Sequence, residues 1–308
     1  MLAGMLRETP VVPVKLDGVR LFAKLEYQNP FGSLKDRAAF WILKSAIERG
    51  QVVPGSTIIE SSSGNFALAL AHLSRLLDLN FVPVIDPNIT ETYESSLRRL
   101  CRTVVKVDTR DDTGGFLKTR LRKVEELLAE LPNSFWTNQY GNPDNMAAHY
   151  RLTGEEICRA VPDLDYLFVG VSSGGTVSGL SRRVKAHNPN VRVVAVDAEG
   201  SVIFGGPPKR RYIPGIGSSI VPPLVGEALI DEVVMIPEAE TVVACRELLE
   251  RHGLFVGGST GTVYAAVKRY LPKFERDRTP TAVFLCADRG SAYLDTLFNP
   301  EWATKLLR

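Results

Sequence analysis

The chain has 308 residues, which is long for one small core and predicts two lobes of roughly 150 residues each. Hydrophobic residues make up 44% and charged residues 23%, which is ordinary for a soluble globular protein. A net charge of +2 without a long basic stripe gives no reason to expect a nucleic-acid partner or a polybasic membrane patch.

Short β-branched runs alternate with amphipathic helical patterns along the whole chain. The predicted strands are Leu21–Leu25, Thr57–Glu60, Phe81–Asp86, Thr103–Asp108, Ser134–Asn138, Tyr166–Val171, Val191–Asp197, Glu232–Ile236 and Ala282–Asp288. Several are apolar with little alternation, which is typical of strands covered on both faces. The pattern predicts α/β architecture with largely parallel sheets.

Two helices are clear from their spacing of apolar residues. One runs through Ala39–Ile47 and is closed by Gly50, and the other covers Phe116–Leu131. The stretch Gly205–Ser219 is rich in Gly and Pro, so we expect a long loop there, and long loops in compact domains are often functional.

The first motif, Asn29–Arg37, leads directly into a helical pattern. Ser33 and Asp36 resemble a capping box, which places Lys35 in the first helical turn. The positive end of the helix dipole disfavours an ammonium there, and a lysine with a lowered pKa can act as a nucleophile and as a base. On this motif alone, a solvated lysine beside a helix cap is the favoured interpretation.

The second motif, Glu60–Asn65, is a hydroxyl-rich turn between a strand and a helix that starts near Phe66. Such a turn presents several N–H donors to an anion, typically a carboxylate or a phosphate. An N-cap turn with spare serines is an equally good interpretation.

The third motif, Val171–Gly179, follows an apolar strand. Gly174 and Gly175 allow the backbone to approach a phosphate closely, while Ser173 and Thr176 supply hydroxyls. The motif fits neither a Walker A loop nor GxGxxG, so it favours a phosphate cradle without a nucleotide.

The fourth motif, Gly257–Gly261, also enters a helix. It is interpreted as a second phosphate loop, as a close backbone approach to a flat ring, or as a plain glycine-rich turn.

The cysteines and the N-terminus indicate a reducing compartment. Cys101, Cys158, Cys245 and Cys286 form no CxxC pair and fall in apolar segments, so we expect buried free thiols. The four histidines lack metal-site spacing and are interpreted as structural or surface residues, so no metal is expected. Neither a secretory signal nor a bilayer-spanning stretch is recognisable, and we expect a cytoplasmic protein with no membrane partner.

Together and in this order, the four motifs resemble those of the fold-type II pyridoxal 5′-phosphate (PLP) enzymes, the cysteine synthases and cystathionine β-synthases. The resemblance covers nearly the whole chain. It implies a two-lobed α/β fold of the tryptophan synthase β-like type, with parallel-rich sheets. The smaller N-terminal lobe would be residues 36–145, and the larger PLP-binding lobe would be residues 1–35 and 146–308. A homodimer acting on small amino-acid substrates is also implied.

The same resemblance implies roles for individual residues. Lys35 would carry PLP as a Schiff base and act as the catalytic base, while Asn65 would hydrogen-bond the 3′-oxygen of the cofactor. The residues implied to hold the cofactor phosphate are Ser173, Gly174, Gly175 and Thr176. The residues implied to hold the substrate carboxylate are Ser62, Ser63, Gly64 and Gln139. Ser259 would face the pyridine nitrogen, and its neutral hydroxyl would make the ring a weaker electron sink, which suits loss of a β-substituent.

Three stretches, Phe22–Tyr27, Val196–Gly205 and Pro214–Gly217, narrow the resemblance to one branch. This branch comprises N-(2-amino-2-carboxyethyl)-L-glutamate synthases, which join O-phospho-L-serine to the amino group of L-glutamate and release phosphate. They catalyse the first step to 2,3-diaminopropionate in the biosynthesis of the siderophore staphyloferrin B and in related pathways.

Departures from the cysteine-synthase pattern favour that branch and add three candidate substrate-binding residues. Ser172 stands where cysteine synthases usually have Gly, and Tyr140 adds a second hydroxyl. Arg120 matches an arginine of the branch, and a guanidinium can pair with a phosphate or a γ-carboxylate. A solvated helix-face arginine is as good an interpretation of Arg120. For the run Lys209–Arg211, a solvated loop is favoured over attraction of anionic substrates.

Three rival functions remain open at this point. A cysteine synthase would use O-acetyl-L-serine and sulfide, and Ser172 weighs against it. A serine or threonine dehydratase would release a keto acid without a second substrate. A PLP-binding scaffold without turnover is disfavoured by the complete set of motifs.

Overall fold

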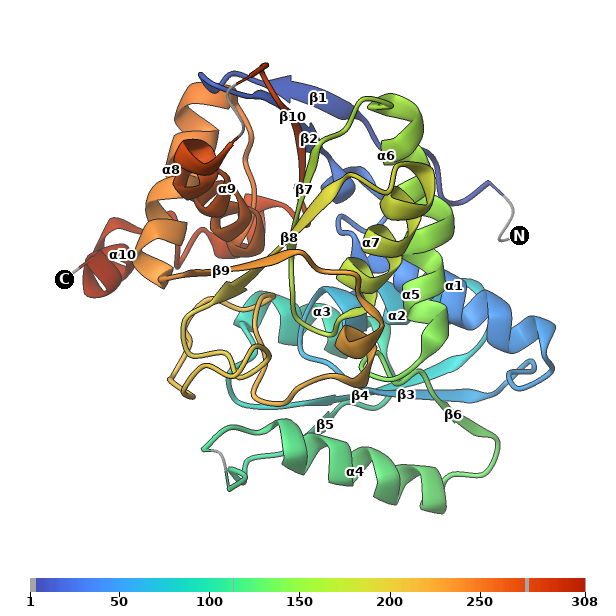
Figure 1. The fold of residues 1–308 in the computed structure, drawn as a ribbon. Helices are drawn as coiled ribbons and strands as arrows, with labels where there is room; N and C mark the ends of the chain where they lie inside the picture. The colour runs from blue at the N-terminus through green and yellow to red at the C-terminus, as the bar shows by residue number, and fades with distance from the viewer. Residues whose placement is uncertain (1–3, 113, 275–276, 308) are drawn as a thin grey trace.

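The computed structural model describes residues 4–112, 114–274 and 277–307, and their strands form two sheets (Figure 1). The order of the larger sheet is β1-β2-β10-β7-β8-β9, and that of the smaller sheet is β5-β4-β3-β6. Every pair of neighbouring strands in the two sheets is parallel except the antiparallel pair β1 and β2. The predicted α/β fold with parallel-rich sheets is therefore confirmed.

Each predicted strand is present, with ends shifted by at most a few residues. The strands of the larger sheet are β1 (Val11–Val14), β2 (Arg20–Lys24), β7 (Tyr166–Gly170), β8 (Arg192–Ala198), β9 (Glu232–Ile236) and β10 (Thr281–Leu285). The strands of the smaller sheet are β3 (Thr57–Ser61), β4 (Asn80–Ile85), β5 (Val105–Lys106) and β6 (Ser134–Trp136). The pattern did not predict β1, because Pro13 interrupts it; proline is tolerated there since β1 is an edge strand.

Helices cover both faces of each sheet (Figure 1). The helices around the smaller sheet are α1 (Lys35–Glu48), α2 (Asn65–Leu76) and α3 (Glu91–Leu100) on one face and α4 (Leu117–Glu130) on the other. The helices around the larger sheet are α5 (Pro143–Ala148), α6 (Gly154–Ala160), α7 (Gly175–His187), α8 (Glu238–His252), α9 (Gly258–Tyr270) and α10 (Pro300–Leu307). None of the helices in the described ranges is both long enough and apolar enough to cross a lipid bilayer.

Both helices predicted from apolar spacing are confirmed. α1 buries Ala39, Ile42, Leu43 and Ala46 on one face, and each large apolar side chain so buried contributes about 1.5–3 kcal/mol. Gly50 then takes a left-handed backbone conformation with φ of +71°, which ends the helical segment. The predicted loop at 205–219 contains no helix or strand. The proposed lobe boundaries stay a prediction.

The first turns of α1 are tied to the larger sheet by a buried ionic cluster. Arg37 donates from Nε to Glu26 Oε2 at 2.6 Å and from Nη1 to Glu156 Oε1 at 2.7 Å. Lys24, on β2, donates to the backbone carbonyl of Thr9 at 2.6 Å and also pairs with Glu156. All five residues are buried. The cluster therefore joins β2, the N-terminal segment, α1 and α6 through bonds between buried groups.

We predict that Arg37→Met destabilises the protein by about 3–5 kcal/mol, because the change leaves Glu26 and Glu156 buried without their main counter-charge. The measurement is urea-induced unfolding followed by circular dichroism. The control is Arg20→Met, which removes the exposed pair between Arg20 and Asp163 and should cost about 0–1 kcal/mol. Equal losses in the two variants would contradict the prediction.

Candidate active site

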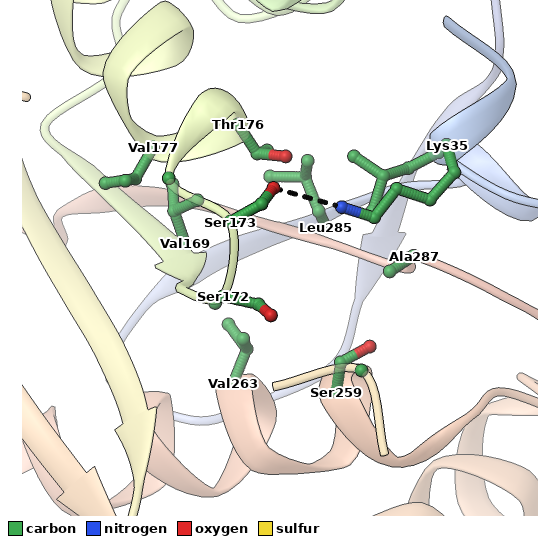
Figure 2. A pocket seen from close by; sticks show the side chains of 14 residues that line it. Lys35, Val169, Ser172, Ser173, Thr176, Val177, Ser259, Val263, Leu285 and Ala287 are labelled. Carbon is green, nitrogen blue, oxygen red and sulfur yellow. Dashed lines mark hydrogen bonds between the residues drawn. The ribbon is translucent and has the colours of Figure 1, made fainter. Parts of the chain in front are cut away.

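Lys35 is the first residue of α1, as predicted, and its amine lies inside a cavity (Figure 2). Its Nζ is 3.4 Å from the hydroxyl of Ser173. Burial lowers the pKa of Lys35 from its ordinary value to about 8, and the nearby carboxylates of Glu60 and Asp288 oppose part of that change. About a tenth of the amine is therefore unprotonated at pH 7, far more than for an ordinary lysine, and this fraction can act as a nucleophile or base.

The helix start that positions Lys35 differs in detail from the expected capping box. The Ser33 hydroxyl accepts from the backbone N–H of Lys35 at 3.2 Å, one residue before the expected partner. Asp36 accepts from the Ser33 hydroxyl at 3.2 Å and from the backbone N–H of Phe31 at 2.6 Å. The Asp36 carboxyl group thus closes the loop before the helix. The expected capping box is therefore replaced by a wider turn around Ser33.

The third motif connects β7 to α7, and its glycines are required by the packing of the protein itself. Gly174 has φ of +90°, and a Cβ there would lie 2.8 Å from the backbone nitrogen of Val225. A Cβ on Gly175 would lie 2.3 Å from the side chain of Asn145. The loop therefore starts α7 with its N–H groups close to Ser173, an arrangement suited to an anion.

His149 lies directly behind this loop. It begins η2 (His149–Thr153), a π-helical turn, and its ring bridges Thr153 Oγ1 at 3.1 Å and Thr176 Oγ1 at 3.3 Å. Burial lowers the pKa of His149 well below its ordinary value, and the charge of Lys35 acts in the same direction. His149 is buried, as expected for a structural histidine. In addition, it contacts Thr176 in the third motif.

One cavity is lined by residues of the first, third and fourth motifs (Figure 2). The predicted site residues that line it are Lys35, Ser172, Ser173, Gly174, Thr176 and Ser259. The Ser172 hydroxyl donates to the backbone carbonyl of Gly217 at 3.1 Å, so its oxygen remains able to accept a bond from a ligand. Lys35 is the only charged side chain among the described residues that line this cavity.

The glycines of the fourth motif are explained by packing against the protein. A Cβ on Gly257 would lie 2.1 Å from Asp288 Oδ1, and one on Gly258 would lie 2.2 Å from Ile213. A Cβ on Gly261 would lie 2.3 Å from the sulfur of Cys245. This favours the glycine-rich turn over a second phosphate loop.

Asn65 is held from two sides. Its Nδ2 donates to Asp288 Oδ2 at 2.7 Å, and its Oδ1 accepts from the hydroxyl of Tyr93 at 2.7 Å. Tyr293 also donates to Asp288 Oδ2, at 2.6 Å. Because the amide oxygen is occupied, Asn65 presents its second N–H as a donor to any ligand beside it. Asp288 lies after β10 and Asn65 begins α2, so this bond links elements of the two sheets.

Arg120 contacts the second motif. Its Nη1 donates to the Ser63 hydroxyl at 3.1 Å, and its Nε is 3.2 Å from Asp86 Oδ2. Only 13% of its side chain is exposed, so the interpretation as a solvated helix-face arginine is wrong. Ser62, in the same turn, accepts from the backbone N–H of Ala67 at 3.2 Å and keeps its hydroxyl proton for another partner. A Cβ on Gly64 would meet no atom within 4 Å, which leaves the turn open at that residue.

Gln139 and Tyr140 are held against the end of β3 by Glu60. The buried Glu60 carboxylate accepts from Thr137 Oγ1 at 2.6 Å and from the backbone N–H of Gln139 at 3.2 Å. Gln139 Nε2 in turn donates to the Ser61 carbonyl at 3.3 Å. Burial raises the pKa of both Glu60 and Tyr140, and the nearby Arg120 lowers that of Tyr140 in part.

Several residues around the site received no role from the sequence: Glu60, Asp86, Tyr93, Asp288 and Tyr293. Glu60 and Asp288 could have been found from the sequence, since each is an acid at or just beyond the carboxyl end of a buried strand.

The expectation of a solvated run at 209–211 is wrong for Arg211, which donates to the carbonyls of Gly200 at 2.7 Å and Ser218 at 3.2 Å. The four cysteines are free, with Cys101 half-buried and the others buried.

Comparisons with known proteins agree on one family. The family model described as "Pyridoxal-phosphate dependent enzyme" matches residues 2–287. An N-(2-amino-2-carboxyethyl)-L-glutamate synthase of Ralstonia nicotianae is 44% identical over 303 residues, which cover 97% of this chain and 89% of the relative.

Solved structures show the same relationship. The O-acetylserine dependent cystathionine β-synthase of Helicobacter pylori has a TM-score of 0.88 at 28% identity, covering 96% of this chain and 97% of the other. A hydrogen sulfide-producing enzyme of Fusobacterium nucleatum has a TM-score of 0.88 at 28% identity, covering 96% and 99%. An O-ureido-L-serine synthase has a TM-score of 0.89 at 26% identity, covering 97% and 95%.

The donors in the cavity fit pyridoxal phosphate. An aldehyde needs an unprotonated amine, and the lowered pKa of Lys35 supplies one. A phosphate needs several N–H and O–H donors, which Ser173, Thr176 and the start of α7 provide. Ser259 offers a neutral hydroxyl to a ring. Asn65, which is not among the described residues that line this cavity, keeps one amide N–H for a ring oxygen.

We predict that Lys35, in protein freed of cofactor, reacts with an amine-modifying reagent with a midpoint near pH 8, because the neutral amine is the reactive form. The measurement is brief labelling across a pH series, read for the peptide that contains Lys35 by mass spectrometry. In urea-denatured protein the same lysine should give a midpoint of about 10.4. Identical midpoints in folded and denatured protein would contradict the lowered pKa.

Proposed function

The chain belongs to the pyridoxal-phosphate dependent enzymes, and on that premise we propose that it joins O-phospho-L-serine to the amino group of L-glutamate. The product would be N-(2-amino-2-carboxyethyl)-L-glutamate, with release of phosphate. The reaction is a β-replacement, and it would supply 2,3-diaminopropionate for siderophore or related biosynthesis. The expected cytoplasmic homodimer is part of the same proposal.

The observation that supports these substrates best is the position of Arg120. A guanidinium that is 13% exposed, paired with Asp86 and bonded to Ser63, lies beside the turn proposed to hold the substrate carboxylate. Both proposed substrates carry an anionic group beyond the α-carboxylate, and a guanidinium binds phosphate or carboxylate with two parallel bonds. The similar synthase of Ralstonia nicotianae carries the name of the same reaction.

Lys35 performs the proton transfers in the proposed mechanism. When bound, pyridoxal phosphate withdraws electrons from an attached amino acid and so makes its Cα–H acidic. Lys35 Nζ takes that proton as base and returns it at the end of the cycle, which its pKa of about 8 allows near neutral pH. Burial keeps bulk water from competing for the proton.

The other residues bind and orient the substrates. The turn at Ser62–Gly64 and Gln139 would hold the α-carboxylate, and Arg120 would pair with the phosphate of the first substrate or the γ-carboxylate of the second. Over the cycle the Cβ–O bond of phosphoserine breaks, and the phosphate leaves with its electron pair. The amine of glutamate then forms the new Cβ–N bond and gives up one proton. Ser259, a neutral hydroxyl, would disfavour a protonated ring and thus transamination.

The test is an assay of the holoenzyme with O-phospho-L-serine, with and without L-glutamate, in which released phosphate and product mass are measured. The expected result is phosphate release and the new product only when both substrates are present. A parallel assay supplies O-acetyl-L-serine and sulfide. Cysteine formation far above the glutamate-dependent rate would favour a cysteine synthase, and keto-acid release without glutamate would favour a dehydratase.

In the same assay, Lys35→Ala should abolish turnover and covalent attachment of the cofactor, because no other amine lines the cavity among the described residues. Attachment is read as the mass added after borohydride reduction. Lys44→Ala on the solvent side of the same helix serves as the matched control and should retain both. Full activity of the Lys35 variant would contradict the proposed mechanism.

We predict that Arg120→Met raises the KM for O-phospho-L-serine by roughly 10–100-fold, the equivalent of about 1.5–3 kcal/mol for a charged hydrogen bond. Methionine keeps the packing of the α4 face while removing the charge. Arg122→Met, on the exposed side of the same helix, should leave KM unchanged. Unchanged kinetics for both substrates in the Arg120 variant would exclude this residue from substrate binding.

A further inference from the structure

A second cavity of about 640 Å³ lies at the opposite end of the smaller sheet from the candidate active site. Thr57 and Asn80, the first residues of β3 and β4, line it, whereas the site residues lie at or beyond the ends of these strands. The other walls come from the ends of α2, α3 and α4. Among the described residues, none lines both cavities.

The cavity exists because the edge of the sheet is incomplete there. β5 has only two residues, and it pairs with Val84 and Ile85 at the far end of β4. The beginning of β4, at Phe81 and Val82, therefore has no strand neighbour on that side in the described part of the chain. The space that a longer strand would fill is left open between helices on the two faces of the sheet.

The lining combines an apolar floor with positive charge at the mouth. Leu79, Leu100, Leu127 and Leu131 are among the apolar residues that line it. At the exposed mouth lie Arg75, Arg102 and Asp78, an excess of one positive charge.

Polar groups in the wall are left without partners. Within the described ranges, Arg75 and Arg102 form neither an ion pair nor a side-chain hydrogen bond. Ser74 is 1% exposed, yet its hydroxyl has no hydrogen-bond partner among the described residues. A buried hydroxyl without a partner normally costs about 1–3 kcal/mol, so it marks a place where a ligand can supply the missing bond.

Four of the elements that line this cavity each carry a residue of the candidate active site nearer their other end. The pairs, with the cavity residue first, are Thr57 and Glu60 on β3, Ser74 and Asn65 on α2, Leu100 and Tyr93 on α3, and Leu127 and Arg120 on α4. The rise of 1.5 Å per helical residue and about 3.3 Å per strand residue puts the members of each pair roughly 10–14 Å apart. A helix moves nearly as a rigid body over this length.

We propose that the second cavity binds a small organic carboxylate with an apolar body, and that its occupancy alters the candidate active site through β3, α2, α3 and α4. The carboxylate pairs with Arg75 and Arg102, and the apolar body covers the leucine floor. A ligand that draws these ends together changes the positions of Asn65 and Arg120 at the other ends. The inference concerns binding and therefore does not require the proposed substrates to be correct.

The test uses hexanoate, hexylamine and inorganic phosphate as probes of the holoenzyme, with binding measured by isothermal titration calorimetry. Hexanoate should bind saturably, while hexylamine, which has the same body and the opposite charge, should not. Phosphate, which has charge without an apolar body, should bind more weakly than hexanoate. Absence of saturable hexanoate binding at millimolar concentrations, or equal binding of hexylamine, overturns the proposal.

Two variants locate the binding. In Arg75→Ala/Arg102→Ala, hexanoate affinity should fall at least tenfold, about 1.4 kcal/mol. Arg122→Ala, an exposed arginine of α4 that does not line the cavity, is the matched control and should bind like the parent. Affinity that persists in the double variant places hexanoate elsewhere, including at Arg120, and overturns the assignment.

The coupling is tested by hydrogen–deuterium exchange. Saturating hexanoate should slow exchange in the peptides that contain Asn65 and Tyr93, and this effect should be absent in the double variant. Slower exchange confined to the cavity walls would show that hexanoate binds without affecting the candidate active site. This result would overturn the proposed coupling. The readout needs no turnover, so failure of the proposed reaction and failure of this inference are separable.

Discussion

The candidate site depends on the buried pairing of Arg37 with Glu26 and Glu156. Burying four charges is costly, and the cluster is tolerable because Lys24 and Arg37 balance the two carboxylates and their hydrogen bonds are satisfied. Arg37 is two residues after Lys35, so the same bonds that hold the helix start also fix where the reactive amine enters the cavity. Because the partners of Arg37 come from the N-terminal segment, a short helical turn and a helix of the larger sheet layer, α1 cannot shift without leaving a buried charge unpaired.

The second constraint is that the site is shared between elements of both sheets. The larger sheet supplies the loop before α7, Ser259 and Asp288, while the smaller sheet supplies Asn65 and the turn before it. Asp288 and Tyr93 hold the two ends of the Asn65 amide, which fixes its orientation as a donor. The orientation of Asn65 therefore depends on its bond with Asp288.

The sequence predicted what is local and left out what comes from distant contacts. The positions of Lys35 and of the loop at Ser173–Thr176 follow from motifs in which a few adjacent residues determine a helix start. The fold class follows from the alternation of strand and helix patterns along the chain. The partners of Asn65 could not be predicted, because Tyr93 and Asp288 are brought to it only by tertiary packing. The same limit explains the wrong expectation for Arg211, whose exposure depends on how its loop folds back on Gly200.

The loop at Ser172–Thr176, which is proposed to hold the cofactor phosphate, has no charged side chain, and burial keeps His149 behind it neutral. Thr176 has one hydroxyl proton, which it can give either to His149 or to a bound phosphate. When the phosphate takes it, His149 must carry its own proton on Nε2 and accept from Thr153 on Nδ1. Arrival of a phosphate at this loop would therefore select one tautomer of His149.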